Sequence, residues 1–209
     1  MLKPSVAPSH TVKMGETVLL EPLTVAKHAA DLWEAQDDEL WRYLPDGPFA
    51  TREAFDECIR GKEQAKLLLF WAIVDRATGK ARGCAAVMNM DLPNGASEIG
   101  NVLLTKGLQQ TRQATEAFYL FLRVCLEEMG CRRCVWKCNN ENEPSKRAAA
   151  RLGFTFEGVH RQHLIVKGRN RDTAWFSMLD CEWPAQKARF QAWLRDDNFD
   201  AVGGQKKKL

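Results

Sequence analysis

The segment GLQQTRQATEAFYLF, residues 107–121, leads from an apolar stretch into a long helical pattern and could bind phosphate. A helix start leaves backbone N–H groups unpaired and carries partial positive charge, so anions bind there. Thr111 can cap this helix or bond a phosphate oxygen. Arg112 can make a charge-assisted bond to phosphate or point into solvent. After Gly107 the segment contains no glycine, the residue that usually lets backbone approach phosphate closely.

Asn142 and Ser145 stand three positions apart at the start of a short helical pattern that ends at LGF, residues 152–154. Asn and Ser at such positions cap helices, because their side chains accept hydrogen bonds from free N–H groups. The same placement suits contact with a bound cofactor. The two roles do not exclude each other.

Glu98 begins an apolar strand pattern over residues 97–104. A carboxylate in that place can accept a proton from a reacting group. The alternation of the strand can turn Glu98 into a cleft, or it can leave a solvated carboxylate at the sheet edge.

His160 and His163 precede a polar turn, KGRNRD at 167–172, whose tip is expected to carry Arg169. A histidine can act as a base near pH 7 with an ordinary pKa. Gly-Arg-Asn is also common turn chemistry, so the tip has a purely structural interpretation as well.

The run CRRCVWKC, residues 131–138, raises the question of a zinc site. Such a site needs four ligands, and no second C-x-x-C follows the first. Alternation instead places Cys134, Trp136 and Cys138 on one face of a strand. We therefore expect a strand here and no metal.

The composition is that of an ordinary soluble domain, with 45% hydrophobic and 27% charged residues in a chain of 209. The net charge of +3 comes partly from the terminal run 206–208 and predicts no nucleic-acid partner.

The longest apolar run, 67–74, is far shorter than the ~20 residues of a membrane span. The first residues lack the apolar core of a signal peptide, which predicts a cytoplasmic protein. The seven cysteines are then expected to be reduced thiols.

The elements that must position these residues follow from periodicity and from turn and capping residues. Helices are predicted over 25–40, from Thr51 to Gly61, over 111–129, over 144–152 and from Pro184 onward. Strands are predicted over 15–23, on both sides of a turn at Thr78–Gly79, and over 97–104, 132–138, 154–166 and 173–181. This order predicts a mixed α/β domain at 15–181, with a flexible arm at 1–14 and a C-terminal helix and basic tail at 182–209.

The segment NENEPSKRAAARLGFTFEGV, residues 140–159, resembles the N-x-x-S/A…LGF…G run of the GCN5-related N-acetyltransferase (GNAT) superfamily. GETVLLEPL near the start, EIGNVLL in the predicted fourth strand and ATEAF in the long helix are similar to the RimJ/RimL-type branch. The resemblance covers about residues 15–181. It implies a GNAT fold, with a mixed central sheet of six to seven strands that splays between the fourth and fifth strands.

The resemblance also implies acetyl-CoA as the acetyl donor, with pantetheine in the splay and pyrophosphate on the amides that start the long helix. The residues implied to contact acetyl-CoA are Val102, Leu103, Leu104, Gln110, Thr111, Arg112, Gln113, Ala114, Thr115, Asn142 and Ser145. Aligning ATEA puts the glycine positions of the family on Gln110 and Arg112. The close approach that glycine allows is therefore an open question at these two residues.

The catalytic roles that the resemblance implies fall on Ser145 and Glu98. Many family members protonate the leaving thiolate with a tyrosine, and Ala149 occupies that position here. Ser145 is then the best donor to the sulfur, and Glu98 matches an acidic position of the branch and would be the base. The resemblance places His160, His163 and, more weakly, Arg169 on the acceptor side.

We therefore predict an N-acetyltransferase that acts on a small amine or amino-acid-like acceptor. No cysteine is placed like an acyl carrier, which favours direct transfer in a ternary complex. Two alternatives remain, a protein N-terminal acetyltransferase and a CoA-binding regulatory protein that has lost catalysis. No membrane partner is expected, and a homodimer is left open.

Overall fold

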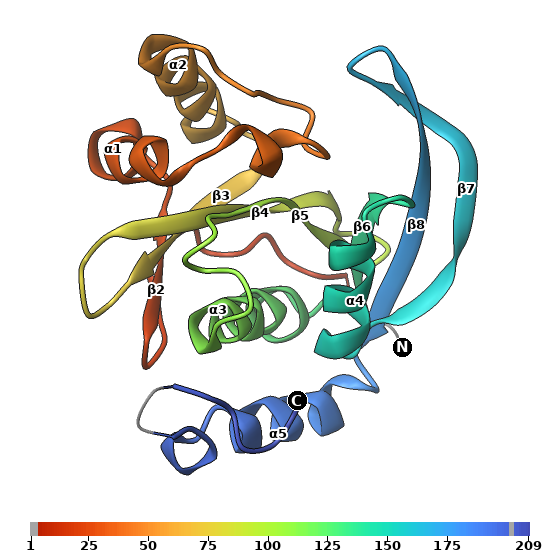
Figure 1. Cartoon of the computed structure of the whole chain (residues 1–209). Coiled ribbons are helices and arrows are strands. Elements are labelled where there is room, and N and C mark those ends of the chain that lie inside the picture. The colour runs from red at the N-terminus through yellow and green to blue at the C-terminus, as the bar shows by residue number, and fades with distance from the viewer. Residues whose placement is uncertain (1–3, 201–202) are drawn as a thin grey trace.

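The computed structural model describes residues 4–200 and 203–209, and its centre is one sheet of eight strands with helices on both faces (Figure 1). The strands are β1 (Lys13–Met14), β2 (Val18–Pro22), β3 (Leu69–Asp75), β4 (Ala81–Asp91), β5 (Ala96–Leu104), β6 (Arg133–Asn139), β7 (Thr155–Val166) and β8 (Arg169–Leu179). The α-helices are α1 (Val25–Ala35), α2 (Arg52–Glu63), α3 (Arg112–Arg123), α4 (Glu143–Leu152) and α5 (Trp183–Trp193). Short helical turns are η1 (Asp38–Trp41), η2 (Val124–Glu128) and η3 (Asp196–Asn198).

The predicted mixed α/β fold is confirmed, and the sheet has one strand more than the six or seven expected. The strand order is β1-β2-β3-β4-β5-β6-β8-β7. The additional strand is β1, which has only two residues and pairs with Leu19 and Leu20 of β2. Two residues are too short for a periodicity to be visible in the sequence.

Most neighbouring strands are antiparallel, and the exception lies in the middle of the sheet. β5 and β6 are parallel, because the chain returns through α3 between them. Such a crossover needs a helix, whereas the antiparallel pairs β3–β4 and β7–β8 are joined by tight turns. This parallel pair is the place where the family fold opens.

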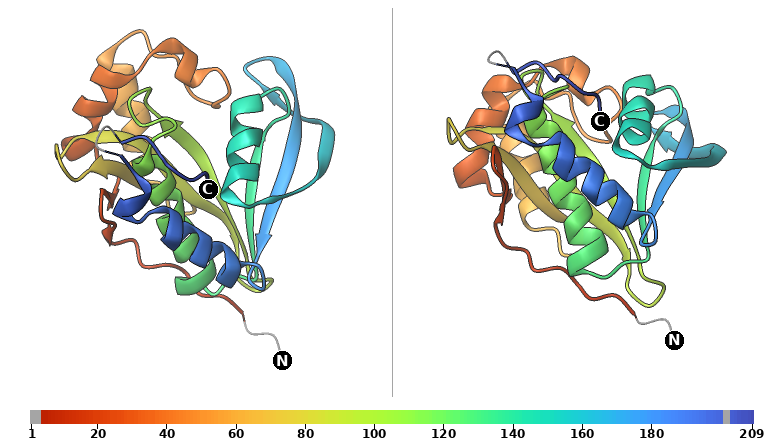
Figure 2. Two further views of the ribbon diagram at one scale, coloured as in Figure 1. Left: turned by 60° about the horizontal axis from the view of Figure 1, so that its bottom comes forward. Right: turned by 90° about the horizontal axis from the view of Figure 1, so that it is seen from below.

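The core lies on both faces of the sheet, as the alternation in β3 shows. Phe70, Ala72 and Val74 belong to a cluster under α1 and α2. Trp71 and Ile73 point the other way, into the larger cluster under α3, α4 and α5. Figure 2 shows α3 and α5 side by side on this second face. A strand covered on both faces reads as a continuous apolar run, as LFWAIV does.

Three helices differ from the sequence-based boundaries. The helix predicted over 25–40 is divided into α1, which ends at Ala35, and the short turn η1. Gly61 does not end α2, which continues to Glu63. The long helix predicted over 111–129 is α3 followed without a break by η2, a π-helical turn at Val124–Glu128. Thr24 and Thr51 cap α1 and α2 as predicted.

Glu116 of the ATEAF segment joins α3 to the start of β2. Its side chain is buried and accepts hydrogen bonds from the backbone N–H groups of Glu16, Thr17 and Val18. The Thr17 hydroxyl donates to the same carboxylate. Gly15 has no room for a side chain there, because a Cβ atom would lie 2.7 Å from the Glu116 carboxyl carbon.

The N-terminal segment predicted to be a flexible arm makes specific contacts where the structure describes it, while residues 1–3 lie outside the described residues. The Ser5 backbone N–H donates to the carbonyl of Leu92 at 3.0 Å, and that of Val6 donates to Met129 at 2.9 Å. The mobility of this segment in solution stays a prediction.

Candidate active site

The sheet opens between β5 and β6. These strands are paired only from Ala96 to Ile99, opposite Arg133 to Trp136, and diverge beyond that point. On its other edge β5 carries a bulge, because Ala86 faces Gly100 while Cys84 faces Leu103. Bulges bend a strand and are common beside active sites. The predicted splay between the fourth and fifth long strands is therefore present.

The three β5 residues predicted to line the opening alternate across the sheet. Leu103 is buried in the cluster under α1 and α2. Val102 and Leu104 are partly buried against the opposite cluster, under α3. Asn101, at the bulge, has a φ of 50°.

The loop before α3 keeps a glycine-like backbone without glycine. Gln110 has a φ of 61°, in the left-handed region that glycine usually occupies. The side chain of Gln109 bonds to the carbonyl of Leu104 at 2.9 Å and supports the loop. The sequence left open whether this loop can adopt a glycine-like backbone without glycine. At Gln110 it does, although the residue has a side chain.

The Thr111 hydroxyl serves as a helix cap. It accepts from the backbone N–H of Ala114 at 3.1 Å and donates to the carbonyl of Leu108 at 2.6 Å. Thr115, one turn later, is buried and bonds back to the carbonyl of Thr111 at 3.3 Å. Capping is thus what the structure shows of Thr111. The backbone N–H groups near Gln113 remain the predicted phosphate contacts.

Arg112 takes neither of the two orientations considered from sequence. Its guanidinium donates to the carbonyl of Leu194, forms an ion pair with Asp196 at 2.8 Å, and lies 4.6 Å from the ring centre of Phe199. The C-terminal segment thus holds the side chain. A phosphate contact by Arg112 would require this segment to release it.

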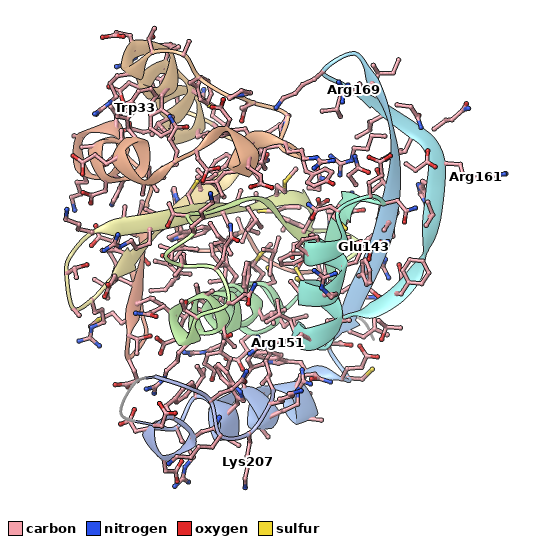
Figure 3. All side chains as sticks on the ribbon, viewed as in Figure 1. Trp33, Glu143, Arg151, Arg161, Arg169 and Lys207 are labelled. Carbon is pink, nitrogen blue, oxygen red and sulfur yellow. The ribbon has the colours of Figure 1, made fainter. Side chains whose placement is uncertain are left out.

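Two other arginines lie beside the start of α3. Arg151 of α4 donates to the Thr115 hydroxyl at 3.0 Å and lies 4.9 Å from the ring centre of Trp193. Arg189 of α5 donates to the carbonyl of Arg151 at 3.0 Å. Burial, and then the charge of Arg189, lowers the pKa of Arg151. Figure 3 labels Arg151 between α4 and α3. Neither arginine forms an ion pair with a carboxylate within residues 4–200 and 203–209.

Asn142 and Ser145 stand at the start of α4, beside the opening. The side chain of Asn142 caps the helix by accepting from the Ser145 backbone N–H at 3.2 Å. The Ser145 hydroxyl oxygen accepts from the Trp136 indole N–H at 3.0 Å. The hydroxyl proton is therefore free to be donated elsewhere. Cys138 is a near neighbour of Ser145, and burial raises the pKa of its thiol.

Glu98 is buried, not a solvated edge carboxylate. Its Oε2 atom forms an ion pair with Lys137 Nζ at 2.7 Å and accepts from the Asn89 amide at 2.8 Å. Lys137 also lies 4.0 Å from the ring centre of Trp175 on β8. Glu98 thus has the burial expected of a carboxylate in a cleft. Its Oε1 atom takes part in neither of these two contacts.

His160 and His163 gather around Trp175 on the same side of the sheet. The His160 ring centre lies 4.5 Å from that of Trp175, and His163 Nδ1 is hydrogen-bonded to the Thr173 hydroxyl at 3.0 Å. Burial, followed by the charges of His160 and Lys137, lowers the pKa of His163. The pairing register of β7 shifts between His160 and Leu164, and a surface hollow of about 760 Å³ lies at residues 160–163.

Arg169 does not lie at the tip of the hairpin. The turn is formed by Lys167 and Gly168, with φ values of 51° and 73°, and Arg169 is already the first residue of β8. Two successive residues with positive φ are typical of a two-residue hairpin turn. The predicted turn over 167–172 was therefore too long, because strand pairing continues through Asn170 and Arg171.

Two hydrogen bonds join the segment between α1 and α2 to residues beyond β6, on the other side of the opening. Lys167 Nζ donates to the carbonyl of Trp41 at 2.7 Å. The Tyr43 hydroxyl donates to the carbonyl of Glu141 at 3.2 Å. We call these two contacts the bridge. The bridge spans the side of the sheet on which Glu98 and Trp175 lie.

Comparison with known proteins identifies the family. Residues 17–155, more than half of the chain, match the model of the acetyltransferase (GNAT) domain. The chain belongs to the GNAT acetyltransferase family. This confirms the resemblance carried by the segment at 140–159.

Solved GNAT structures share the whole architecture. A GCN5-related N-acetyltransferase from Brucella melitensis is 44% identical, covers 99% of this chain and 96% of its own, and superposes with a TM-score of 0.96. A GNAT-family protein from Chromobacterium violaceum is 38% identical over 88% of this chain and 93% of its own, with a TM-score of 0.82.

A curated GNAT relative is YdaF of Bacillus subtilis, whose name assigns it provisionally as a ribosomal N-acetyltransferase. It is 29% identical over 109 residues, which is 52% of this chain and 59% of the relative. The match thus spans less than two thirds of the relative's length. Its name agrees with the RimJ/RimL-type branch predicted from sequence.

The residues of this GNAT domain fit the acetyl-CoA implied by the family. The loop at Gln110 has the backbone shape that brings amides to a phosphate, and the first helical turn supplies free N–H groups. Arg151 and Arg189 add cations that no carboxylate of the described residues neutralises. These are the groups that a diphosphate-bearing ligand needs.

Several residues of the candidate site were not identified from sequence. Lys137 follows the alternation of β6, but nothing in the sequence shows that it pairs with Glu98. In the sequence Arg151, Arg171 and Arg189 look like any other basic residue, and only the fold shows that no carboxylate of the described residues forms an ion pair with them. In the described part of the chain, no three His, Cys, Asp or Glu side chains gather in a way that could hold a metal, and no helix is long and apolar enough to cross a membrane.

Proposed function

We propose that this protein transfers the acetyl group of acetyl-CoA directly to a primary amine of a small acceptor. The observation that carries the proposal is the opening between β5 and β6, with Ser145 on one face of the sheet and the Glu98–Lys137 pair on the other. Acetyl-CoA would supply an acetyl group already activated as a thioester.

Glu98 is proposed to bring the amine to its reactive form. An alkyl amine has a pKa near ~10, so a base must take its proton at neutral pH. Lys137 and Asn89 both bind Oε2 of Glu98, which leaves Oε1 to face the amine or a bridging water. His163 is the alternative base, since its lowered pKa keeps the imidazole neutral at pH 7.

Ser145 is proposed to donate a hydrogen bond to the departing sulfur. Its oxygen is already engaged by Trp136, which orients the hydroxyl. Ala149, where many family members have a tyrosine, is fully buried in α4 and has no donor. A serine is a weak acid, so we expect it to act through hydrogen bonding in the transition state.

Direct transfer is favoured over a covalent acyl-enzyme. Cys138 is the thiol beside Ser145, and burial raises its pKa, which disfavours the nucleophilic thiolate. Acetyl transfer through this cysteine would need a thiolate, and burial outweighs the stabilisation that Ser145, Arg171 and Lys146 give to that thiolate.

The bridge supports a small acceptor. The contacts Lys167–Trp41 and Tyr43–Glu141 cross the side on which Glu98 lies, and we infer that they restrict the approach of a folded protein to Glu98. The second candidate is a protein N-terminus, favoured by the name of YdaF. An extended N-terminal peptide is the form in which such a substrate would have to enter.

The first test is a thermal-unfolding titration with acetyl-CoA, CoA and ATP. A ligand at about 100 times its dissociation constant adds about 2.7 kcal/mol, or roughly 5–10 °C for a chain of this size. We expect acetyl-CoA and CoA, but not ATP, to raise the midpoint. Absence of any shift at millimolar acetyl-CoA would overturn the proposal.

The second test measures CoA release with an amine panel for Glu98→Gln and Ser145→Ala. We expect each to lower kcat by roughly 10²-fold or more, since positioned acid–base groups contribute about that much. Glu53→Gln, an exposed glutamate on α2, is the matched control. Acetyl-CoA binding without turnover of any amine would favour the catalytically impaired CoA-binding protein.

A further inference from the structure

The acceptor side of the opening carries more positive than negative charge. Glu98 is the carboxylate there, and Lys137 already pairs with it at 2.7 Å. Arg171 lies on the same face of β8 as Thr173 and Trp175, at alternate positions of the strand. It is near enough to Glu98 for their charges to influence each other. One carboxylate thus faces two cations.

Arg171 is partly shielded from water, and no carboxylate of the described residues forms an ion pair with it. Its side chain is half-buried, and its Nε atom is buried without a hydrogen-bond partner in the described part of the chain. The adjacent Asp172 is engaged elsewhere, since it accepts from the Gln162 backbone at 2.7 Å and from the Asn170 amide at 3.0 Å. Burial lowers the pKa of Arg171, yet an arginine stays charged at neutral pH.

A second unpaired donor lies on the same face. The indole N–H of Trp175 is buried without a hydrogen-bond partner among the described residues. Buried donors are normally satisfied, and an unsatisfied one calls for a ligand or a water. An Arg guanidinium presents parallel N–H groups whose geometry matches a carboxylate.

We propose that the acceptor carries a carboxylate close to its amine, as a free amino acid does, and that Arg171 binds this carboxylate while Glu98 faces the amine. The proposal rests on the acetyl transfer proposed above. An amino acid brings one anion and one amine, which match Arg171 and the carboxylate of Glu98. A polyamine brings only positive charge and would be repelled by Arg171 and Lys137.

The test uses matched acceptors with acetyl-CoA: the twenty amino acids, their carboxamides and the corresponding decarboxylated amines. Rates are compared at equal concentrations of the unprotonated amine. We expect kcat/KM for the best amino acid to exceed that of its carboxamide and its amine at least ten-fold. Arg171→Gln should remove this preference, because it should raise KM for the amino acid far more than KM for the plain amine.

Arg60→Gln is the matched control, because Arg60 lies on α2, outside the acceptor side of the opening, and pairs with Glu57. It should leave the preference intact. Binding of acetyl-CoA by calorimetry, together with an unchanged melting midpoint, shows that Arg171→Gln is folded.

The outcomes separate the two proposals. If acetyl-CoA does not bind, the proposed function fails. If acetyl-CoA binds but carboxamides, peptides or polyamines react as well as amino acids, only the present proposal is overturned. It is also overturned if no amino acid is acetylated and none binds to the CoA complex in calorimetry. Retention of the amino-acid preference in Arg171→Gln would likewise contradict it.

Discussion

The carboxylate of Glu157 joins three strands next to the candidate site. It stands on β7, accepts from Arg133 of β6 at 2.6 Å and accepts from the Ser177 hydroxyl of β8 at 2.7 Å. The hydrogen-bonded Arg133, ahead of Ser177, lowers the pKa of Glu157 to about 2. Glu157, which lies within the family motif, thus connects strands of the sheet, and Asn142 and Ser145 stay the residues of this motif that are predicted to contact acetyl-CoA.

Glu157→Gln should therefore change acid stability. The stabilisation by Glu157 is complete above the ordinary pKa of 4.5 and is lost as the pH falls through the folded value of about 2. Because the side chain is 36% exposed, we expect a loss of only about 1 kcal/mol at pH 7. Urea unfolding between pH 7 and 2 should show a flatter acid limb in the variant. Equal slopes in both proteins would contradict this prediction.

At the scale of the element, the loop between β5 and α3 reaches its shape by two local devices. Thr111 closes the start of α3, and Gln110 takes a left-handed backbone that costs a non-glycine residue roughly 1–2 kcal/mol. The C-terminal segment then covers the helix start and binds Arg112 through Leu194 and Asp196. The loop is thus shaped locally but covered by a distant part of the chain.

Gln110→Gly is expected to raise the free energy of unfolding by a few tenths to about 1 kcal/mol. The relief of left-handed strain is partly offset by the greater freedom of glycine in the unfolded chain. Gln110→Val should lower it by about 1–2 kcal/mol, because a β-branched residue fits this φ poorly. Urea unfolding of the two variants checks the pair. Equal destabilisation by Gly and Val would show that strain at this φ is not the deciding factor.

At the scale of the whole molecule, buried polar contacts connect the N-terminal strands to the crossover helix. Glu116 receives three backbone N–H groups and one hydroxyl from residues 16–18, about a hundred positions away in the sequence. These contacts fix β2 against α3, the helix whose start carries the predicted phosphate site. The stability of the molecule and the position of the site therefore depend on the same residue.

Glu116→Ala should destabilise the protein by about 2–4 kcal/mol, since several buried donors lose their acceptor. Glu116→Gln keeps one carbonyl acceptor and should cost less. Chemical denaturation of both variants, beside Glu34→Ala on the exposed face of α1, measures the effect. A loss below 1 kcal/mol in Glu116→Ala would mean that the Glu16–Val18 backbone finds other acceptors.

Much of the fold was predictable because its determinants are local. Periodicity placed the long strands and helices within a few residues, and Thr24, Thr51, Thr111 and Asn142 cap the helices they precede. The hairpin tip at Lys167 was harder, because Arg169, Asn170 and Arg171 have turn-like side chains yet pair in β8. Tertiary pairing with β7 outweighs their local preference.

The sequence by itself determined the order of the elements, the GNAT family and the placement of Asn142 and Ser145 at a helix start. Each of these depends on residues within a few positions of one another. Only the tertiary structure decided that Arg112 binds residues 82 and 84 positions away, that Glu98 pairs with Lys137, and that Arg171 has no acid partner among the described residues. A charged side chain has many chemically equivalent partners in the sequence, and the fold alone selects which of them comes within hydrogen-bonding distance.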